Sequence, residues 1–312
     1  MADRSLTPLV SINIPCYRQL DYARRCLDAI RAQTVRDFEV TLYDDGESDE
    51  YRDYVAGLGD ERVRYHRNPV RLGAMRNMFH AITAGTGRYT MAFHEDDLIG
   101  SRYLETAVGI LEADPSCGFV GAEVQQFDEE PSRRQLDRPI AASQVERYAD
   151  GAAFVRALAR GVNPMFASIV YRRTALDGIV PAHDDYATLV DRPFLLDILG
   201  RWSAAIVRGA TVWYRAHGEG DRRHAAMRPE HILRLFARYR AALPADLTDA
   251  DRRLFYDFSG YWLFTLHRLV PDEAQWPLRR FVLRALRERL YNPRWSRGVA
   301  RKQLLADVVT GR

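Results

Sequence analysis

Short apolar runs typical of β-strands alternate with amphipathic runs typical of α-helices along the first third of the chain. The strand-like runs cover residues 9–17, 38–46, 62–68 and 88–93. Between them, apolar side chains at helical spacing predict a helix over 21–34, with Asp21 as its N-cap, and another over 74–87. Strands and helices in this order predict an α/β fold with a parallel sheet and right-handed crossovers.

The central part of the chain carries further strand-like and helical runs. Apolar runs at 117–127 and 165–173 predict strands, residues 151–161 predict a short helix, and residues 201–217 predict a terminal pair of strands. The run from Asp128 to Arg138 is strongly polar, and we expect a mobile loop there.

From about residue 225 onward the pattern becomes helical. Amphipathic runs cover 229–243, 248–269 and 276–290. Thr248 stands immediately before the second of these runs and is its expected N-cap. The change of pattern predicts an α/β domain over 1–222 and a helical region over 223–312 that serves packing, oligomerisation or contact with a membrane surface.

The composition is that of an ordinary globular protein, with 47% hydrophobic and 28% charged residues. The net charge of +3 gives no argument for binding nucleic acid, and we expect no nucleic-acid partner. The three cysteines have no CxxC spacing, which favours reduced thiols over a disulfide framework or a zinc site. The N-terminus lacks a signal-type apolar core, and no run approaches the roughly 20 apolar residues of a membrane span, so we expect a cytoplasmic protein.

Acidic residues follow two of the predicted strands. Asp44 and Asp45 end the second strand-like run, and Glu95, Asp96 and Asp97 follow the fourth. Ligands of parallel α/β sheets bind beyond the carboxyl ends of the strands, where both clusters are expected. Adjacent carboxylates repel one another unless something neutralises them, and the sequence leaves a divalent metal, an arginine cluster or solvent as candidates.

Four motifs in this order resemble those of glycosyltransferase family 2, which has the GT-A nucleotide-sugar fold. They are "IPCYR" at 14–18, "YDDGESDE" at 43–50, "RLGAMRN" at 71–77 and "FHEDD" at 93–97. The resemblance covers roughly residues 8–218. It implies a Rossmann-like, mostly parallel sheet flanked by helices, to which the C-terminal helical region is appended.

The resemblance also implies a pocket for a nucleotide-sugar. Its expected residues are Pro15, Tyr17, Asp44, Asp45, Arg71, Asn77 and Asp96. In this family the acid matched by Asp45 accepts a hydrogen bond from the ring nitrogen of a uracil-type base, while Asp44 would support the loop or the ribose. Arg71 would contact the base or the diphosphate, and Asn77 would line the pocket or tie its helix to the sheet.

The family binds Mn²⁺ or Mg²⁺ at the acidic motif, where the cation bridges a carboxylate and both phosphates. Asp97 matches the direct ligand, and Asp96 is expected on the ribose or sugar side. His217 matches a further contact to the metal or diphosphate, with Arg215 nearby. The chain departs from the family at His94, which replaces the usual first acid of the motif and leaves the metal's identity and affinity open.

The expected catalytic base lies after the metal motif, in the segment 183–199. Asp191 matches the family acid that opens a short helix, where a carboxylate is electrostatically supported. It would take the proton of the acceptor hydroxyl as that oxygen attacks the anomeric carbon. Asp184 and Asp185 compete for this role, and a simple helix cap is the structural alternative for Asp191.

The predicted function is an inverting, metal-dependent transfer of one sugar from a UDP-type or dTDP-type donor to a glycan, a lipid-linked acceptor or a small molecule. A catalytically impaired nucleotide-sugar-binding protein is one alternative, for which His94 is the reason. A nucleotidyltransferase is the other, although "IPCYRQLD" lacks the glycine-rich basic loop that usually follows the first strand of that class.

The C-terminal segment 276–302 holds nine basic residues against one acidic residue, Glu288. A basic amphipathic helix can lie on an anionic bilayer, which would place the protein at the inner face of the membrane next to a lipid-linked acceptor. The alternative is that its apolar face packs on neighbouring helices or on a second copy of the chain in a homodimer.

Overall fold

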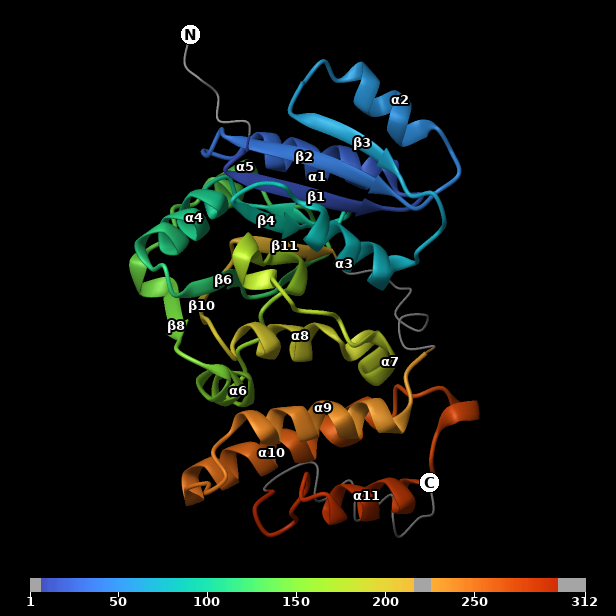
Figure 1. The fold of residues 1–312 in the computed structure, drawn as a ribbon, viewed down its shortest axis with the longest axis vertical. Helices are drawn as coiled ribbons and strands as arrows, with labels where there is room; N and C mark the ends of the chain where they lie inside the picture. The colour runs from blue at the N-terminus through green and yellow to red at the C-terminus, as the bar shows by residue number, and fades with distance from the viewer. Residues whose placement is uncertain (1–6, 216–225, 297–312) are drawn as a thin grey trace. The chain divides into compact units, whose positions relative to one another are not determined.

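The structure is a computed structural model, which describes residues 7–215 and 226–296. The chain divides into two compact units, which are described separately (Figure 1). The first unit consists of Met1–Tyr148, Asn163–Gly178 and Trp202–Ala216, and the second of Ala149–Val162, Ile179–Arg201 and His217–Arg312. Among the described residues, no helix combines the length and the apolar composition that a membrane crossing requires.

The first unit is built on an eight-stranded sheet with the order β3-β2-β1-β4-β9-β6-β10-β8. Its first half is parallel and consists of β1 (Val10–Cys16), β2 (Phe38–Asp44), β3 (Val63–Arg67) and β4 (Tyr89–Ala92). β1 is almost completely buried, because it lies between β2 and β4 with helices on the sheet. These strands confirm the four that the apolar pattern predicts.

The other half of the sheet is mixed. It consists of β6 (Cys117–Ala122), β8 (Val145–Tyr148), β9 (Val170–Arg172) and β10 (Ser203–Val207). β9 is antiparallel to both β4 and β6, β10 is parallel to β6, and β8 is antiparallel to β10. A separate three-stranded sheet joins β5 (Leu98–Ile99), β7 (Gln125–Phe127) and β11 (Val212–Arg215).

Five α-helices of the first unit lie in the part of the chain that the structure describes. They are α1 (Leu20–Arg31), α2 (Glu50–Gly57), α3 (Ala74–Ala84), α4 (Tyr103–Ala113) and the single turn α5 (Arg133–Leu136). The N-cap of α1 is Gln19, so the prediction of Asp21 was wrong by two residues. Asp21 lies instead in the first turn, where its carboxylate still interacts favourably with the helix N-terminus.

The run from Asp128 to Arg138 contains α5 and is not a featureless loop. The side chain of Gln135 accepts a hydrogen bond from the backbone N–H of Ser132 at 2.9 Å, which fixes the first turn of α5. Glu130 from the same run pairs with Arg25 of α1 and with Arg215 of β11. The expectation of a mobile loop overlooked these long-range ion pairs.

The second unit is helical. Its α-helices are α6 (Gly151–Ala159), α7 (His183–Tyr186), α8 (Asp191–Ile198), α9 (Pro229–Ala242), α10 (Asp249–His267) and α11 (Leu278–Arg287). Thr248 is the N-cap of α10, as predicted, and its side chain accepts a hydrogen bond from the Asp251 amide at 3.1 Å. Aromatic side chains form much of the packing, as in the edge-on contact of Phe264 with Phe281.

The sequence predicted one boundary, between residues 222 and 223, but the second unit is assembled from three separate segments of the chain. It takes in α6, α7 and α8 from the earlier part of the chain because these helices are bound to α9 and α10. Arg156 of α6 forms a two-bond ion pair with Asp251 of α10, at 2.8 and 3.0 Å. Arg238 of α9 donates to Asp197 of α8 at 2.7 Å.

Candidate active site

The two acidic clusters leave the parallel sheet at the same edge. β1 pairs in parallel with β2 on one side and β4 on the other, in a register that sets Cys16 opposite Asp44 and Asn13 opposite Ala92. The chain therefore passes from β2 into Asp44 and Asp45, and from β4 into the acidic loop, at the carboxyl ends of strands that flank β1. This is the edge at which α/β sheets bind their ligands.

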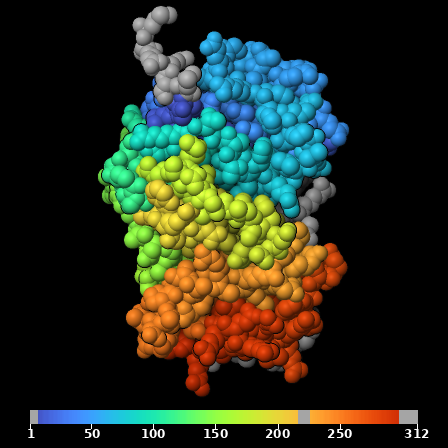
Figure 2. Space-filling view, viewed as in Figure 1, coloured from blue at the N-terminus to red at the C-terminus, as the bar shows by residue number. Residues whose placement is uncertain are grey.

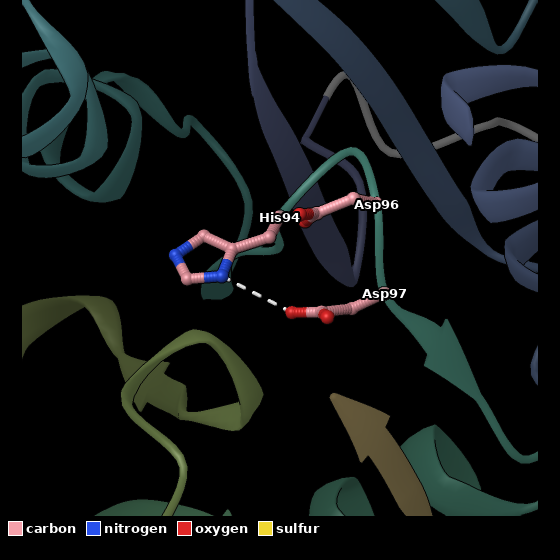
Figure 3. Close-up of side chains that lie close together, drawn as sticks. All are labelled: His94, Asp96 and Asp97. Carbon is pink, nitrogen blue, oxygen red and sulfur yellow. Dashed lines mark hydrogen bonds and ion pairs between the residues drawn. The ribbon is translucent and has the colours of Figure 1, made fainter. Parts of the chain in front are cut away.

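Three side chains of the loop after β4 come together as a candidate metal site. One ligand atom each from His94, Asp96 and Asp97 lies within 4.8 Å of the others (Figure 3). The Nδ1 atom of His94 is 3.1 Å from Oδ2 of Asp97. These three side chains are therefore close enough to form a candidate site for one cation.

The chemistry of these donors fits a divalent cation. Asp97 is completely buried, and this burial raises the pKa of its carboxyl group, because a carboxylate loses its hydration there. Its Oδ1 atom accepts a hydrogen bond from the Arg215 amide at 2.9 Å, which leaves Oδ2 on the side of His94. Two carboxylates and one imidazole together form a mixed oxygen and nitrogen donor set of a kind that binds divalent cations.

Arg215, at the end of β11, is hydrogen-bonded to the loop that carries Asp96 and Asp97. Its Nε atom donates to the carbonyl oxygen of Asp96 at 3.0 Å, and its guanidinium group pairs with Glu130 at 3.1 Å. The same group lies over the rings of Tyr22 and Phe127, at 4.5 and 4.7 Å from their centroids. Arg215 therefore supports the acidic loop through its backbone.

Asp45 is bound by the loop that precedes α3. Its Oδ1 atom accepts hydrogen bonds from the Leu72 amide at 2.8 Å and from the Asn68 side chain at 3.0 Å, and its Oδ2 atom accepts one from the Gly73 amide at 2.7 Å. Gly73 has a φ of 79°, a conformation that favours glycine. Oδ2 receives this one bond from the described residues and keeps a lone pair for a ligand donor.

Asp44 faces inward and organises the turn after β2. Its side chain is fully buried, where Oδ1 accepts from the Gly46 amide at 2.8 Å and Oδ2 from the Tyr65 hydroxyl at 2.8 Å. The sequence suggested that Asp44 supports either the loop or the ribose, and these two hydrogen bonds fit the first of these roles.

Tyr17 and Arg71 meet next to Asp45. The guanidinium carbon of Arg71 lies 4.4 Å from the centroid of the Tyr17 ring. Arg71 belongs to the same loop that binds Asp45, and Tyr17 follows the end of β1, in which Pro15 pairs with Tyr43 of β2. The fold thus collects these residues from distant sequence positions.

Asn77 is buried between α3 and the sheet. Its amide nitrogen donates to the carbonyl oxygen of Tyr43 at 2.9 Å, and its oxygen accepts from Asn68 at 2.9 Å. Both ends of the side chain therefore tether α3, and Asn68, the next residue in this network, also bonds Asp45.

Glu95 is a residue whose role the sequence did not indicate. It is 8% exposed, and burial raises the pKa of its carboxyl group to about 7. Its oxygens accept hydrogen bonds from the Tyr17 amide at 2.7 Å and from the Tyr51 hydroxyl. The Glu95 carboxylate is therefore bonded to the loop after β1 and to α2, and Glu95 is not one of the three residues of the candidate metal cluster. Partners this distant in sequence leave no local signal.

The expected base and the expected second metal contact lie elsewhere in the chain. Asp191 is the first residue of α8 in the second unit, and its Oδ2 atom is 3.7 Å from Nε of Arg192. Its competitor Asp185 forms an ion pair with Arg234 of α9 at 3.2 Å. His217 lies outside the described residues.

Solved structures of GT-A glycosyltransferases confirm the fold. TarS of S. aureus, solved in complex with UDP, superposes with a TM-score of 0.57 at 15% identity over 97% of this chain and 92% of that chain. The mannosyltransferase PcManGT of Pyrobaculum calidifontis, solved with GDP-Man and Mn²⁺, gives 0.55 at 16% identity over 98% and 88%.

The sequence defines the family. The model of glycosyl transferase family 2 matches residues 11–179, and the chain belongs to this family. A glycosyltransferase of Rickettsia typhi without characterised activity is 29% identical over 111 residues, which are 36% of this chain and 34% of that protein. Glycosyltransferase GlyG of Streptococcus pneumoniae is 27% identical over 103 residues, 32% of this chain and 34% of that protein. These alignments span about a third of each curated relative.

Proposed function

We propose that the protein is an inverting, metal-dependent glycosyltransferase that moves one sugar from a UDP-type or dTDP-type donor to an acceptor hydroxyl. The observation that supports this proposal is that two clusters of polar and aromatic side chains lie at one edge of the parallel sheet. One consists of His94, Asp96 and Asp97, and the other of Tyr17, Asp45 and Arg71. Membership of family 2 supports the same reading.

The nucleotide would bind beside the ends of β1 and β2. The free lone pair on Oδ2 of Asp45 suits the ring N–H of uracil or thymine. The ring of Tyr17, already in contact with Arg71, offers a flat surface for the base, and the guanidinium group of Arg71 is a donor for phosphate oxygens. Asp96 would face the ribose or the sugar.

The diphosphate would lie over the second cluster. Asp97, His94 and Asp96 would hold the cation, and we keep His217 as a further proposed contact. A divalent cation there supplies positive charge to the departing diphosphate. The backbone N–H of Arg215 fixes the Asp97 carboxylate, so that this ligand is pre-oriented.

Asp191 is the proposed general base. The acceptor oxygen forms a bond to the anomeric carbon while the bond from that carbon to the diphosphate oxygen breaks. The acceptor proton passes to the Asp191 carboxylate, and the nucleoside diphosphate leaves with the bonding electron pair. A single displacement of this kind inverts the anomeric centre. Asp191 is the first residue of α8, the position expected for the family acid.

The relatives bind donors of this class. TarS has been solved with UDP and with UDP-GlcNAc, and PcManGT with GDP-Man and Mn²⁺. A thermal-shift screen of nucleoside diphosphates and nucleotide-sugars, with and without Mn²⁺, tests the proposal, because a ligand of the folded state raises the melting temperature. UDP or dTDP compounds with Mn²⁺ are expected to give the largest shifts, and no shift with any nucleotide would contradict the proposal.

We also propose that the outer face of α11 binds an anionic membrane surface. Leu283 and Leu286 are 57% and 37% exposed on this helix, whose other edge buries Phe281 and Ala285. Its exposed arginines are Arg279, Arg280, Arg284 and Arg287. Two exposed leucines among arginines match a bilayer with negative headgroups, and this segment lies at the molecular surface (red in Figure 2).

Co-sedimentation with phosphatidylglycerol vesicles tests this surface. Binding is expected at low salt and is expected to fall with 0.5 M salt and in the Arg279→Glu/Arg287→Glu variant, while neutral vesicles bind poorly. Absence of binding at low salt would refute the membrane proposal, and a homodimer in solution that the same variant dissociates would assign this face to a second copy.

A further inference from the structure

The loop between β1 and α1 holds an unfavourable backbone conformation. Arg18 has a φ of 58°, in the left-handed region that residues with a Cβ atom rarely adopt. Such a conformation persists only where surrounding contacts enforce it, and it is common at functional sites. Arg18 directly follows Tyr17, whose ring is part of the proposed nucleotide pocket.

The contacts that enforce this conformation lie on both sides of Arg18. The amide of Tyr17 donates to the Glu95 carboxylate at 2.7 Å, and the amide of Gln19 donates to the hydroxyl oxygen of Tyr51 at 2.9 Å. The Tyr51 hydroxyl in turn donates to the other oxygen of Glu95. One carboxylate therefore restrains the loop directly at Tyr17 and through Tyr51 at Gln19.

This arrangement is buried and joins three separate parts of the first unit. Tyr51 is 2% exposed and comes from α2, while Glu95 is 8% exposed and comes from the loop that also carries Asp96 and Asp97. Buried hydrogen bonds to a carboxylate are stronger than neutral bonds at the surface and hold their partners in one geometry. The loop with Tyr17 is therefore fastened to the metal-motif loop.

We propose that Glu95 and Tyr51 are positioning residues that fix Tyr17, and with it the base-binding surface next to Arg71, for the nucleotide. This inference rests on the proposed nucleotide site. Glu95 lies between His94 and Asp96 in sequence, yet its carboxylate is bonded on the nucleotide side. The motif would thus contribute to both halves of the donor site, with His94, Asp96 and Asp97 assigned to the cation and Glu95 to the loop.

Titration calorimetry of UDP in the presence of Mn²⁺ tests the inference with three variants. Tyr51→Phe keeps the ring and removes the hydroxyl, and it is expected to weaken UDP binding about fivefold to tenfold, as for the loss of one buried hydrogen bond. Tyr17→Ala is expected to weaken binding more. In the Tyr17→Ala background, Tyr51→Phe is expected to have little further effect, because Tyr51 acts through Tyr17.

Tyr103→Phe is the matched control. Tyr103 is also fully buried, and its hydroxyl donates to the carbonyl oxygen of Ser168 at 2.8 Å. This variant is expected to lower the melting temperature about as much as Tyr51→Phe while the Kd of UDP stays unchanged. Tyr103 is bonded to Ser168 and not to Tyr17, so a change at Tyr103 is not expected to affect the hydrogen bond between Tyr17 and Glu95.

The outcomes separate the inference from the function on which it rests. If wild-type protein binds UDP and Tyr17→Ala weakens binding, but Tyr51→Phe changes the Kd no more than Tyr103→Phe, the inference is overturned and the proposed site stands. The inference is also overturned if Tyr51→Phe has its full effect in the Tyr17→Ala background. If the wild-type protein binds no UDP, or Tyr17→Ala has no effect, both the site and the inference fail.

Discussion

The Nδ1 atom of His94 lies 3.1 Å from the Oδ2 atom of Asp97, across the first turn of the loop that follows β4. Family 2 usually has an acid at the position of His94, and its replacement was the reason to consider an impaired protein. The geometry is compatible with an active protein, since an imidazole nitrogen can itself be a metal ligand and Asp96 lies within 4.8 Å as well.

The replacement leads to a prediction about metal selectivity. His94→Ala is expected to lower the affinity for Mn²⁺ by about 10–100-fold, the range typical of losing a group that tunes a metal site. His94→Asp is expected to restore binding and to shift preference toward Mg²⁺, because an all-oxygen set suits that ion. Calorimetric titration of both ions measures this, and unchanged Mn²⁺ affinity in His94→Ala would remove His94 from the site.

Asp97 is expected to couple metal and donor. In Asp97→Ala the cation loses its buried carboxylate ligand, so Mn²⁺ and UDP should weaken together. The measurement is the Kd of UDP with Mn²⁺ and with EDTA. The wild-type protein should show a large difference between the two conditions and the variant almost none. Retention of a wild-type metal effect in Asp97→Ala would contradict the assignment.

Asp191→Asn is expected to separate binding from chemistry. An amide keeps the shape of the side chain but cannot take a proton, so turnover should fall about 100-fold or more. Donor affinity should stay within about twofold. Transfer rates with a competent acceptor, together with the Kd of UDP, measure both quantities. Undiminished turnover would contradict the assignment of Asp191 and leave Asp184 or Asp185 as the candidate general base.

Arg156 of α6 is bonded to Asp251 of α10, so we expect a substitution of Asp251 to lower the free energy of unfolding. The hydrogen bonds from Arg156 hold the pKa of this carboxyl below its usual value of about 3.9. A carboxyl group with a lowered pKa in the folded state contributes stability that is complete above the unfolded pKa and is lost as pH falls. Asp251→Asn should therefore cost about 1–2 kcal/mol at pH 7 and progressively less below about pH 4.

Urea unfolding followed by circular dichroism measures this effect. Asp249→Asn is the control, because it removes a negative charge from the same first turn of α10, where Asp249 pairs with the exposed Arg252 at 3.2 Å. It should cost less than about 0.5 kcal/mol. Equal effects at the two positions would show that helix charge, and not the tie to α6, explains the loss.

The strands that carry the site could be predicted from the sequence, because buried parallel strands are continuous apolar runs. The helices α2 and α4 were not predicted. In α2 one side chain is buried, Tyr51, so this helix has almost no apolar face. In α4 the exposed residues Glu105, Gly109 and Glu112 recur at helical spacing, but this stripe is narrow and holds only two charged residues.

In the candidate site, too, some residues could be predicted from the sequence and others could not. Asp45 and Asp97 could be proposed from the sequence because Asp45 directly follows β2, Asp97 ends the acidic loop after β4, and each belongs to a recognisable motif. The roles of Glu95, Glu130 and Arg215 could not, since each depends on a partner many residues away, such as Tyr17 for Glu95 and Asp97 for Arg215. The joining of α6 to α10 is equally non-local.

The most direct test of the central proposal is anomalous diffraction from crystals soaked with Mn²⁺ and UDP. The expected result is one manganese peak in contact with Asp97, with its neighbours His94 and Asp96 around it, and with the diphosphate bound to the same ion while the base lies between Tyr17 and Asp45. Manganese peaks elsewhere, with no ion at Asp97 and no nucleotide at Asp45, would contradict it.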